Sequence, residues 1–368
     1  MRTYVEIDLA RVMENVRVIA SQLPEGTALY GAMKADAYGH GAVEVARAAK
    51  KAGLAGCCVA SAEEGEELIA SGIGLPVLLL GRLLPEDEER AVELGLEFNV
   101  FDPAQVARVN AIAGRLQKKA RVHAKLDTGM HRLGMDSDEG VSAMIAALGS
   151  APNVTLEGVF SHLSSADDER AYTLMQKEKF DHWVKMFRGA GFTFKTHLQN
   201  TPGIFNYPGM GYDIARPGIG IYGYGYGFDT GKLRPALSWY ARVLQVRELA
   251  AGETVSYNRT FRAERPMTLA CIAAGYADGY KRCLSSRGEV LIAGRRCKVV
   301  GRVCMDLTMV DVTGVPAAPG DWATLLGTDG GETIDATELA GLCGTINYEI
   351  LTSIHDKRVP RKYVGGGA

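Results

Sequence analysis

Lys34 is the first residue of this chain whose type and surroundings suggest chemistry. It follows the apolar run at 28–31 and stands among small residues, with alanine at positions 32, 35 and 37. Such neighbours leave room for a flat cofactor, and partial burial lowers the pKa of a lysine so that its neutral amine can form a Schiff base. Tyr38 is placed to reach a phosphate from the first turn of a following helix. A lone lysine more often buries its stem and keeps its charged head in water. Whether Lys34 has a functional role therefore depends on the other motifs of the chain.

Further motifs that combine polar side chains with glycine or proline occur along the whole chain. They read KLDTGMHRLG at 125–134, FSHLSSAD at 160–167, NTPG at 200–203, ARPGI at 215–219, VSY at 255–257, GYADG at 275–279, GRVCMD at 301–306 and RVPR at 358–361. Taken singly, each has an ordinary structural explanation. His162 can be a satisfied core histidine, Thr201 a helix cap and Tyr257 an amphipathic strand aromatic. Their functional interpretation therefore depends on a fold that brings them together.

The elements indicate an α/β fold, a (β/α)₈ TIM-like barrel. Apolar runs followed by helical periodicity begin near Ala28, Gly56, Pro76, Glu97, Arg121, Thr155, Lys195 and Asp213. Helix-like stretches lie at 41–51, 62–71, 86–94, 103–117, 138–148 and 169–190. Such alternation gives a parallel barrel whose active-site groups stand at the carboxyl ends of the strands. The residues at these ends are Lys34, Lys125, His162, Asn200, Thr201 and Arg216, with Arg132 in the loop after the fifth strand. An open doubly wound sheet is the alternative, which the lack of a GxGxxG motif after a strand disfavours.

A mostly-β second domain is expected after the Leu233-Arg234-Pro235 break. Short alternating or β-branched runs lie at 239–248, 267–273, 289–292, 297–300, 307–312 and 322–325, with Gly, Pro and Asp-Gly between them. One short helix is expected at 335–343. Residues 1–234 would then form the barrel domain and residues 235–368 the second domain. Strand 3–7 is a candidate to pair with the second domain, because a helix capped by Asp8 separates it from the barrel.

Composition argues against several classes of partner. The chain has 41 basic and 43 acidic residues, a formal net charge of -2, and no long block of like charge, so a small-molecule substrate fits better than a nucleic acid or a membrane surface. The seven cysteines show no metal-ligand spacing, and reduced, mostly structural thiols are expected. An acidic residue lies where a signal peptide needs its apolar core, and no run approaches the roughly 18 apolar residues of a membrane span. A cytoplasmic protein is therefore expected.

Together with residues 32–41, the eight motifs resemble the alanine racemases, fold-type III enzymes that depend on pyridoxal 5'-phosphate. The resemblance implies interconversion of L- and D-alanine, supply of D-alanine for peptidoglycan, and a homodimer with shared active sites. It implies that Lys34 carries the cofactor and serves as a base on one face of the substrate α-carbon. The partner subunit's Tyr257 would serve the opposite face. Because the ordinary pKa of tyrosine is near 10, positive charge from His162 and Arg216 would bias it toward phenolate.

The resemblance also assigns the remaining contacts. Arg216 is implied to face the pyridine nitrogen, and because a guanidinium does not release its proton, the ring stays a weaker electron sink and transamination is disfavoured. Arg132 would hold the phenolic oxygen and orient the substrate carboxylate. Cofactor contacts are further implied for His162, Asn200, Tyr38, Thr201 and the backbone N–H groups of Gly218 and Ile219, the last four groups at the phosphate. On the substrate side the implied residues are Met305, Tyr276 and Asp306, and Lys125 matches a position that is carbamylated in some members.

Two departures from the family pattern bear on specificity. Asn258 follows Tyr257 where many relatives have Gly, a tolerable exchange because Asn also adopts left-handed backbone conformations. Lys357, next to His355, stands before the final RVPR run where some relatives have a tyrosine at the substrate pocket. The alternative function is a serine or broad-specificity racemase of the same fold, since an apolar pocket rejects an added hydroxyl only weakly. A barrel-only cofactor carrier would lack the second domain, and a decarboxylase of this fold type would be expected to carry a cysteine-bearing site, so both are disfavoured.

Overall fold

The computed structural model describes residues 1–366, which form two compact units. The first, here called the barrel unit, consists of Val12–Ala37 and Ala42–Arg234. The second, called the β unit, consists of Met1–Arg11, Tyr38–Gly41 and the chain from Pro235 onward. A short segment between two barrel elements thus belongs to the β unit.

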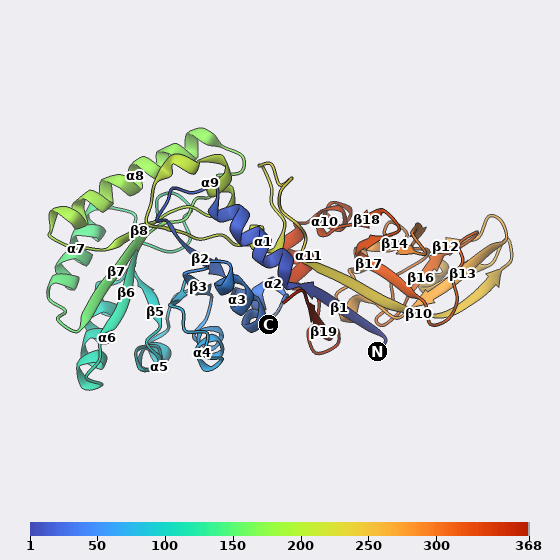
Figure 1. Cartoon of the computed structure of the whole chain (residues 1–368), viewed down its shortest axis with the longest axis horizontal. Coiled ribbons are helices and arrows are strands. Elements are labelled where there is room, and N and C mark those ends of the chain that lie inside the picture. Colours follow the sequence, from blue (N-terminus) through green and yellow to red (C-terminus); the bar gives the residue numbers. More distant parts are fainter. Residues whose placement is uncertain (367–368) are drawn as a thin grey trace. The chain divides into compact units, whose positions relative to one another are not determined.

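Eight parallel strands of the barrel unit close into a barrel (Figure 1). Neighbouring strands pair in sequence order, and β9 closes the ring by pairing Ile214 with Ala28 of β2. The strands are rich in apolar residues because both of their faces are covered, and all four residues of β3 are buried. The predicted barrel is therefore confirmed, and the doubly wound alternative is wrong. The strands are β2 (Ala28–Ala32), β3 (Gly56–Val59), β4 (Val77–Leu79), β5 (Glu97–Val100), β6 (Ala120–Lys125), β7 (Val154–Phe160), β8 (Lys195–His197) and β9 (Ile214–Ala215).

Several of the helices begin at side chains that satisfy their first N–H groups. Asp8 accepts from the backbone N–H of Ala10 at 3.0 Å and so caps α1, as expected, and Asp102 caps α6 in the same way. The helices are α1 (Leu9–Ala20), α3 (Ala42–Lys51), α4 (Ala62–Ala70), α5 (Glu88–Leu94), α6 (Pro103–Arg115), α7 (Asp138–Gly149), α8 (Arg170–Gly189) and α9 (Thr201–Asn206). Within residues 1–366, none of the helices combines the length and the apolar character that crossing a membrane requires.

A nine-stranded sheet forms the centre of the β unit. The long strand β10 pairs antiparallel with β1, β13 and β17, and β1 also pairs with the last strand, β19. The N-terminal strand therefore belongs to this sheet, where it alternates buried and half-buried residues. The strands are β1 (Thr3–Asp8), β10 (Leu237–Leu249), β13 (Met267–Ile272), β14 (Glu289–Ile292), β15 (Arg295–Lys298), β16 (Thr308–Asp311), β17 (Trp322–Asp329), β18 (Glu332–Ile334) and β19 (Arg361–Val364). Outside the sheet lie the pair β11 (Thr254–Val255) and β12 (Phe261–Arg262) and the helices α10 (Ala336–Cys343) and α11 (Asn347–Thr352).

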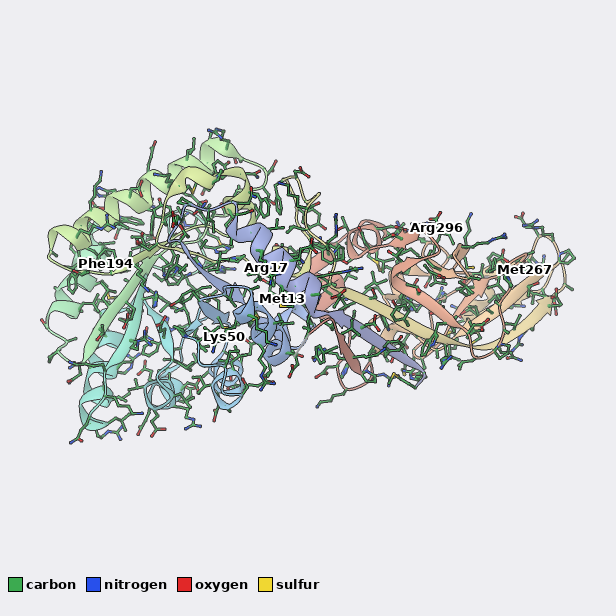
Figure 2. All side chains as sticks on the ribbon, viewed as in Figure 1. Met13, Arg17, Lys50, Phe194, Met267 and Arg296 are labelled. Carbon is green, nitrogen blue, oxygen red and sulfur yellow. A yellow bond between two sulfur atoms is a disulfide. The ribbon has the colours of Figure 1, made fainter. Side chains whose placement is uncertain are left out.

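An ion-pair network fastens one edge of this sheet. Arg296 on β15, labelled in Figure 2, bonds Glu289 of β14 at 3.0 Å. Its other bonds reach Glu332 of β18 at 3.0 Å and Glu338 of α10 at 2.7 Å. One guanidinium thus joins two hairpins and a helix, which a planar group with five donors can do.

Cys283 and Cys343 form a disulfide in the β unit, which corrects the expectation of reduced thiols throughout. Their Cα atoms lie 5.4 Å apart, within the range that a disulfide spans. The bond joins the 3₁₀ turn η6 (Arg282–Leu284) to the last residue of α10. The sequence could not reveal the pair, because the two cysteines are 60 positions apart.

We expect the double substitution Cys283→Ser, Cys343→Ser to lower the free energy of unfolding of the β unit by about 2–4 kcal/mol, because the cross-link restricts the unfolded chain. Denaturant titration of the oxidised wild type and the variant measures this difference. A reductant should lower the stability of the wild type to that of the variant and leave the variant unchanged. A wild type whose stability does not respond to reductant would contradict the cross-link.

Candidate active site

The predicted site residues of the barrel unit gather at one end of the barrel, where the strands end. Lys125 is the last residue of β6 and Arg216 directly follows β9, while Lys34 comes two residues after β2. His162 lies beyond β7, and Thr201 begins the helix after β8. One cavity at this end is lined by Lys125, Leu126, Asp127, Met130, Arg132, Leu133, Ser161 and His162. The prediction that the polar motifs converge is therefore confirmed for the barrel unit.

Lys34 opens a left-handed turn, labelled α2 in Figure 1 (Lys34–Tyr38). Its last four residues have φ between 51° and 54°, a conformation that costs roughly 1–2 kcal/mol for each residue with a side chain. The turn is held in part by Asp36, which accepts from the backbone N–H of Ala42 at 2.7 Å. The following helix begins only at Ala42. Tyr38 therefore lies in the strained turn, and the prediction that it lies in the first turn of that helix is wrong. Strain of this kind is typical of functional sites.

Burial and mutual repulsion among positive groups set the charges of this site. The pKa of Lys34 lies below its ordinary value because the amine is partly buried and faces Arg132. Burial and neighbouring cations, first among them Arg216, hold the pKa of His162 well below its ordinary value. Such a shift disfavours the charged form of His162, and its role as a source of positive charge stays a prediction. Burial lowers the pKa of Arg216 only to about 10, so this arginine keeps its charge at neutral pH.

Lys125 is almost completely buried, with 5% of its surface exposed. Burial, followed by the charges of Arg216 and Arg132, lowers its pKa from 10.5 to about 7. Its amine lies 4.3 Å from the centre of the Phe160 ring, an arrangement that favours the charged form. The neutral amine of Lys125 is therefore far more accessible near neutral pH than that of an exposed lysine.

This pKa predicts how stability depends on pH. Between about pH 7 and 10.5 the unfolded chain holds a proton on Lys125 that the folded protein does not, so stability rises with pH across this window. We expect Lys125→Met to be more stable than the wild type near pH 7, by a margin that shrinks toward pH 10.5. Denaturant titrations in carbonate-free buffer measure the margin. The matched variant Lys185→Met, which removes an exposed lysine of α8, should show no such trend, and a margin that does not change with pH contradicts the prediction.

Asp127 organises the loop that presents Arg132. Its Oδ1 accepts from the backbone N–H groups of Gly129 at 2.9 Å and His131 at 3.0 Å, and its Oδ2 accepts from that of Arg132 at 3.0 Å. Burial alone would raise the pKa of Asp127, but these three bonds bring it below its ordinary value. The side chain of Arg132 thus projects from a loop whose backbone is fixed by its own motif.

Arg216 is held from two sides. One terminal nitrogen lies 2.7 Å from Nδ1 of His197, and the other donates to the carbonyl oxygen of Ser161 at 2.6 Å. The guanidinium also stands over the Phe160 ring, 5.1 Å from its centre. The orientation of this buried cation is therefore strongly restricted.

Thr201 joins the two segments that were predicted to contact a phosphate. Its hydroxyl accepts from the backbone N–H of Gly218 at 3.0 Å and, more weakly, from that of Gly220 at 3.4 Å. Ile219 begins the 3₁₀ turn η3 (Ile219–Tyr222). Asn200 caps α9, because its Oδ1 accepts a backbone N–H in the first turn of that helix at 3.0 Å. Here Asn200 is a helix cap, and its contact with the cofactor stays a prediction.

The β unit carries the other predicted site residues on its surface. Tyr257 is 68% exposed, Met305 53% and Tyr276 42%. Tyr257 begins the turn η4 (Tyr257–Arg259), flanked by Ser256 and Asn258 in left-handed conformations with φ of 67° and 57°. The expectation that Asn258 adopts such a conformation is confirmed. A groove beside Tyr257 is lined by Ser256, Tyr257, Cys304, Met305, Asp306 and Leu307. Two of its exposed side chains, those of Tyr257 and Met305, are thus brought together on the surface of the β unit.

The turn at 304–306 is fastened to the turn at 275–278. The backbone N–H of Tyr276 donates to the carbonyl oxygen of Cys304 at 3.0 Å, and that of Ala277 to Met305 at 2.9 Å. The two turns approach each other so closely that a Cβ on Gly275 would clash with the carbonyl groups of Cys304 and Met305. Only glycine fits there.

Arg358 of the RVPR motif bridges the same two turns. It donates to the fully buried Asp278 at 2.9 Å and pairs with Asp306. The neighbouring side chains of Lys357 and His355 are exposed. The departure from the family pattern therefore lies on the surface of the β unit, next to this bridge.

Three buried polar residues that are linked to Arg216 were not identified from the sequence. His197 contacts Arg216, His123 contacts His197, and Glu97 contacts His123. One signal was available, because alternate residues of a strand share a face, so His123 lies on the same face of β6 as Lys125. His197 and Glu97 carried no comparable signal. Their strands, β8 and β5, are only three and four residues long, which is too short for a reliable pattern of polar and apolar residues.

Both units match protein families. Residues 7–225 match the alanine racemase N-terminal domain, and residues 236–363 match the alanine racemase C-terminal domain. The alanine racemases of Symbiobacterium thermophilum and Geobacter sulfurreducens are 42% and 41% identical to this chain. These matches cover 99% and 98% of this chain, and 97% of each relative.

Solved structures show the same architecture. The alanine racemase from D-cycloserine-producing Streptomyces lavendulae has a TM-score of 0.94 and 35% identity, over 99% of this chain and 97% of that chain. The alanine racemase from Bartonella henselae, solved with covalently bound pyridoxal phosphate, has a TM-score of 0.87 and 30% identity, over 99% of this chain and all of that one.

Proposed function

Because the chain belongs to the alanine racemase family, a family of isomerases that use pyridoxal phosphate, we propose that it interconverts L- and D-alanine with two bases. One base is Lys34 and the other is the partner subunit's Tyr257. The observation that carries the proposal is the state of Lys34, a partly buried amine with a lowered pKa among Arg132, Lys125 and Arg216. A lowered pKa increases the share of the neutral amine, which is the form that acts as a nucleophile and as a base.

The described residues fit pyridoxal phosphate. The amine of Lys34 suits the aldehyde of the cofactor, and two arginines suit its electron-rich ring substituents, Arg216 at the pyridine nitrogen and Arg132 at the phenolic oxygen. When bound, the cofactor supplies an electron-withdrawing ring that acidifies the substrate α-carbon. His162 lies near these groups, since its pKa is lowered by burial and by the charges of Arg216, Lys125, Arg132 and Lys34.

The phosphate would be held by Tyr38, by the hydroxyl of Thr201 and by the backbone N–H groups of Gly218 and Ile219. Asn200 supports this arrangement by capping α9. These hydroxyl and backbone N–H groups can donate hydrogen bonds, which a phosphate accepts.

In the proposed reaction, Lys34 moves a proton at one face of the α-carbon and the partner subunit's Tyr257 moves one at the other face. Arg132 and the backbone N–H of the partner subunit's Met305 orient the substrate carboxylate. Arg216 would face the ring nitrogen of the bound cofactor, and because a guanidinium keeps its proton, this position would favour proton return to the α-carbon over transamination. The partner subunit's Tyr276 and the partner subunit's Asp306 restrict the entrance to short side chains.

Lys125 is proposed as a site of carbamate formation. Its neutral amine adds to carbon dioxide and releases a proton, and the product is a buried anion. The pKa of about 7 supports this proposal, because the reactive form is abundant at neutral pH. A carbamate would place negative charge near Arg132 and Arg216.

A homodimer with shared active sites follows from the same proposal. In it, the groove around Tyr257 faces a second copy of this chain. The exposure of Tyr257, Met305 and Tyr276 supports such an interface, since large apolar side chains are seldom exposed together without a partner. We further propose that the enzyme works in the cytoplasm and supplies D-alanine for peptidoglycan.

The proposal is tested by incubating the purified holoenzyme with L-alanine in D₂O. D-Alanine should form, and the α-proton should be replaced by deuterium. The same assay with L-serine measures specificity through the ratio of kcat/KM values. A clear preference for serine would overturn alanine as the substrate, and failure to invert either amino acid would overturn racemisation.

A further inference from the structure

Four buried polar groups form a continuous hydrogen-bonded chain inside the barrel. Glu97 of β5 lies 3.1 Å from Nε2 of His123, whose Nδ1 lies 2.8 Å from Nε2 of His197. Nδ1 of His197 lies 2.7 Å from a terminal nitrogen of Arg216. None of the four side chains is more than 5% exposed. The chain therefore connects the cation of the active site to a carboxylate at the start of β5 without contact with bulk water.

A glycine makes the contact between the two histidines possible. Gly158 of β7 lies between β6 and β8, the strands that carry His123 and His197. A Cβ at Gly158 would clash with both imidazoles. Phe160, on the same face of β7, stacks on His197 with ring centres 4.7 Å apart and planes 5° apart. The orientation of the second ring is thus fixed by packing as well as by hydrogen bonds.

The direction of every hydrogen bond in the chain is determined from the arginine end. A guanidinium has only donors, so Nδ1 of His197 must accept, and the proton of this ring is on Nε2. His197 then donates to Nδ1 of His123, which leaves the proton of His123 on Nε2, directed at Glu97. Burial and the charge of Arg216 hold the pKa of His197 well below its ordinary value, in agreement with a neutral ring.

The carboxylate end requires the same direction. Burial alone would raise the pKa of Glu97, but the hydrogen bond from His123 and nearby cations bring it below its ordinary value. An ionised carboxylate can only accept. Its other oxygen pairs with Arg121 at 2.5 Å, and Arg121 also bonds Glu157 at 3.0 Å. Both ends thus specify the Nε2–H tautomer for both histidines.

We propose that Glu97 is a positioning residue for racemisation, which acts through His123 and His197 to fix the orientation of Arg216 while leaving its positive charge intact. The proposal rests on the proposed function, in which Arg216 faces the ring nitrogen. A carboxylate in direct contact with Arg216 would orient it equally well but would neutralise its charge. Two neutral imidazoles transmit the orientation and keep the negative charge at a distance. Second-layer partners of this kind fix the tautomer and direction of the groups that they support.

The test is the tautomeric state of both rings in the holoenzyme labelled with ¹⁵N-histidine, assigned by histidine substitution. In the wild type we expect His123 and His197 to carry their protons on Nε2. In Glu97→Leu the buried N–H of His123 loses its acceptor. It can regain one only if His123 carries its proton on Nδ1 and donates to His197, whose own proton then moves to Nδ1 and displaces Arg216. We therefore expect mixed tautomers on both rings and a kcat about 10-fold lower, with little change in KM. Protons on Nδ1 in the wild type, or unchanged tautomers or an unchanged kcat in Glu97→Leu, would overturn the proposal.

Two further variants separate this role from a merely structural one. Glu157→Gln removes a carboxylate that shares Arg121 but bonds to that arginine rather than to the histidines, so tautomers and kcat should stay at wild-type values. A loss in Glu157→Gln as large as that in Glu97→Leu would overturn the proposal. If Glu97→Leu does not fold, Gly158→Ala takes its place, because its methyl group separates the two rings. Glu97 then no longer supports His197, so kcat should fall by a similar factor, while Arg216 and Glu97 each keep the neighbouring ring in its Nε2–H form. A wild-type kcat in Gly158→Ala would overturn the proposal.

The premise is tested independently. Arg216→Met should lower kcat strongly if Arg216 faces the ring nitrogen. Wild-type activity in Arg216→Met would contradict the proposed function and with it the link from Glu97 to racemisation. The tautomers of the wild type would still report whether the hydrogen-bonded chain exists, so the two failures can be told apart.

Discussion

Lys34→Ala is expected to lower kcat/KM for alanine by about 10⁴-fold or more, at the upper limit of what one positioned acid-base group contributes. The effect is large because one substitution removes both the anchor of the cofactor and one of the two proposed bases. The visible absorbance of the lysine-bound cofactor should disappear in the same variant. Chiral analysis of alanine and a spectrum of the purified protein measure the two effects.

The matched control is Lys185→Ala, which removes an exposed lysine from α8. It should keep both the absorbance and the activity of the wild type. If Lys34→Ala kept a cofactor bound through another lysine, with its absorbance intact, the role of Lys34 as anchor would be refuted. Lys125 is the lysine to examine in that case, since it too has a depressed pKa in the same site.

The barrel could be predicted because its signals are local. Several buried strands are short apolar runs, such as β3, and several helices begin at a side chain that caps them, as Asp102 does before Pro103. Since parallel strands place their carboxyl ends together, the positions of Lys34, Lys125 and Arg216 at one end followed from the strands alone. The left-handed conformation of Asn258 also followed from its residue type.

The turn after Lys34 could not be predicted from local preferences. Alanine and tyrosine seldom adopt a left-handed conformation, so the sequence suggested that a helix begins there. The conformation depends on partners far along the chain, because the backbone N–H of Ala35 donates to Glu64 at 2.7 Å. Gly39, directly after the turn, approaches Leu351 so closely that a Cβ would clash with its carbonyl oxygen.

Contacts between residues far apart in the chain could not be predicted from the sequence either. The disulfide depends on the distance between Cys283 and Cys343, which is set by the packing of α10. The charge of His162 depends on burial together with four nearby cations from different strands and loops. Side chains of these kinds have no fixed state of their own, so only their surroundings decide whether they pair or carry a proton.

Tyr257→Phe is expected to lower racemisation by about 10²–10⁴-fold, the usual contribution of a general acid or base. The substitution removes one hydroxyl, and because Tyr257 is exposed on its own chain, the fold should be unaffected. The two enantiomers have equal free energies, so kcat/KM must fall by the same factor in both directions. Tyr240→Phe, which removes a hydroxyl from β10 in the same unit, is the matched control and should keep wild-type activity.

Exchange with solvent identifies which base was lost. In D₂O, Lys34 of the variant can still remove and return the proton of the enantiomer that presents it to the lysine side. That enantiomer should exchange its α-proton much faster than it inverts, whereas the other should do neither. Wild-type racemisation in Tyr257→Phe would contradict the two-base mechanism. Equal loss of exchange for both enantiomers would contradict it as well, because it would mean that the phenol supports binding or assembly and moves no proton.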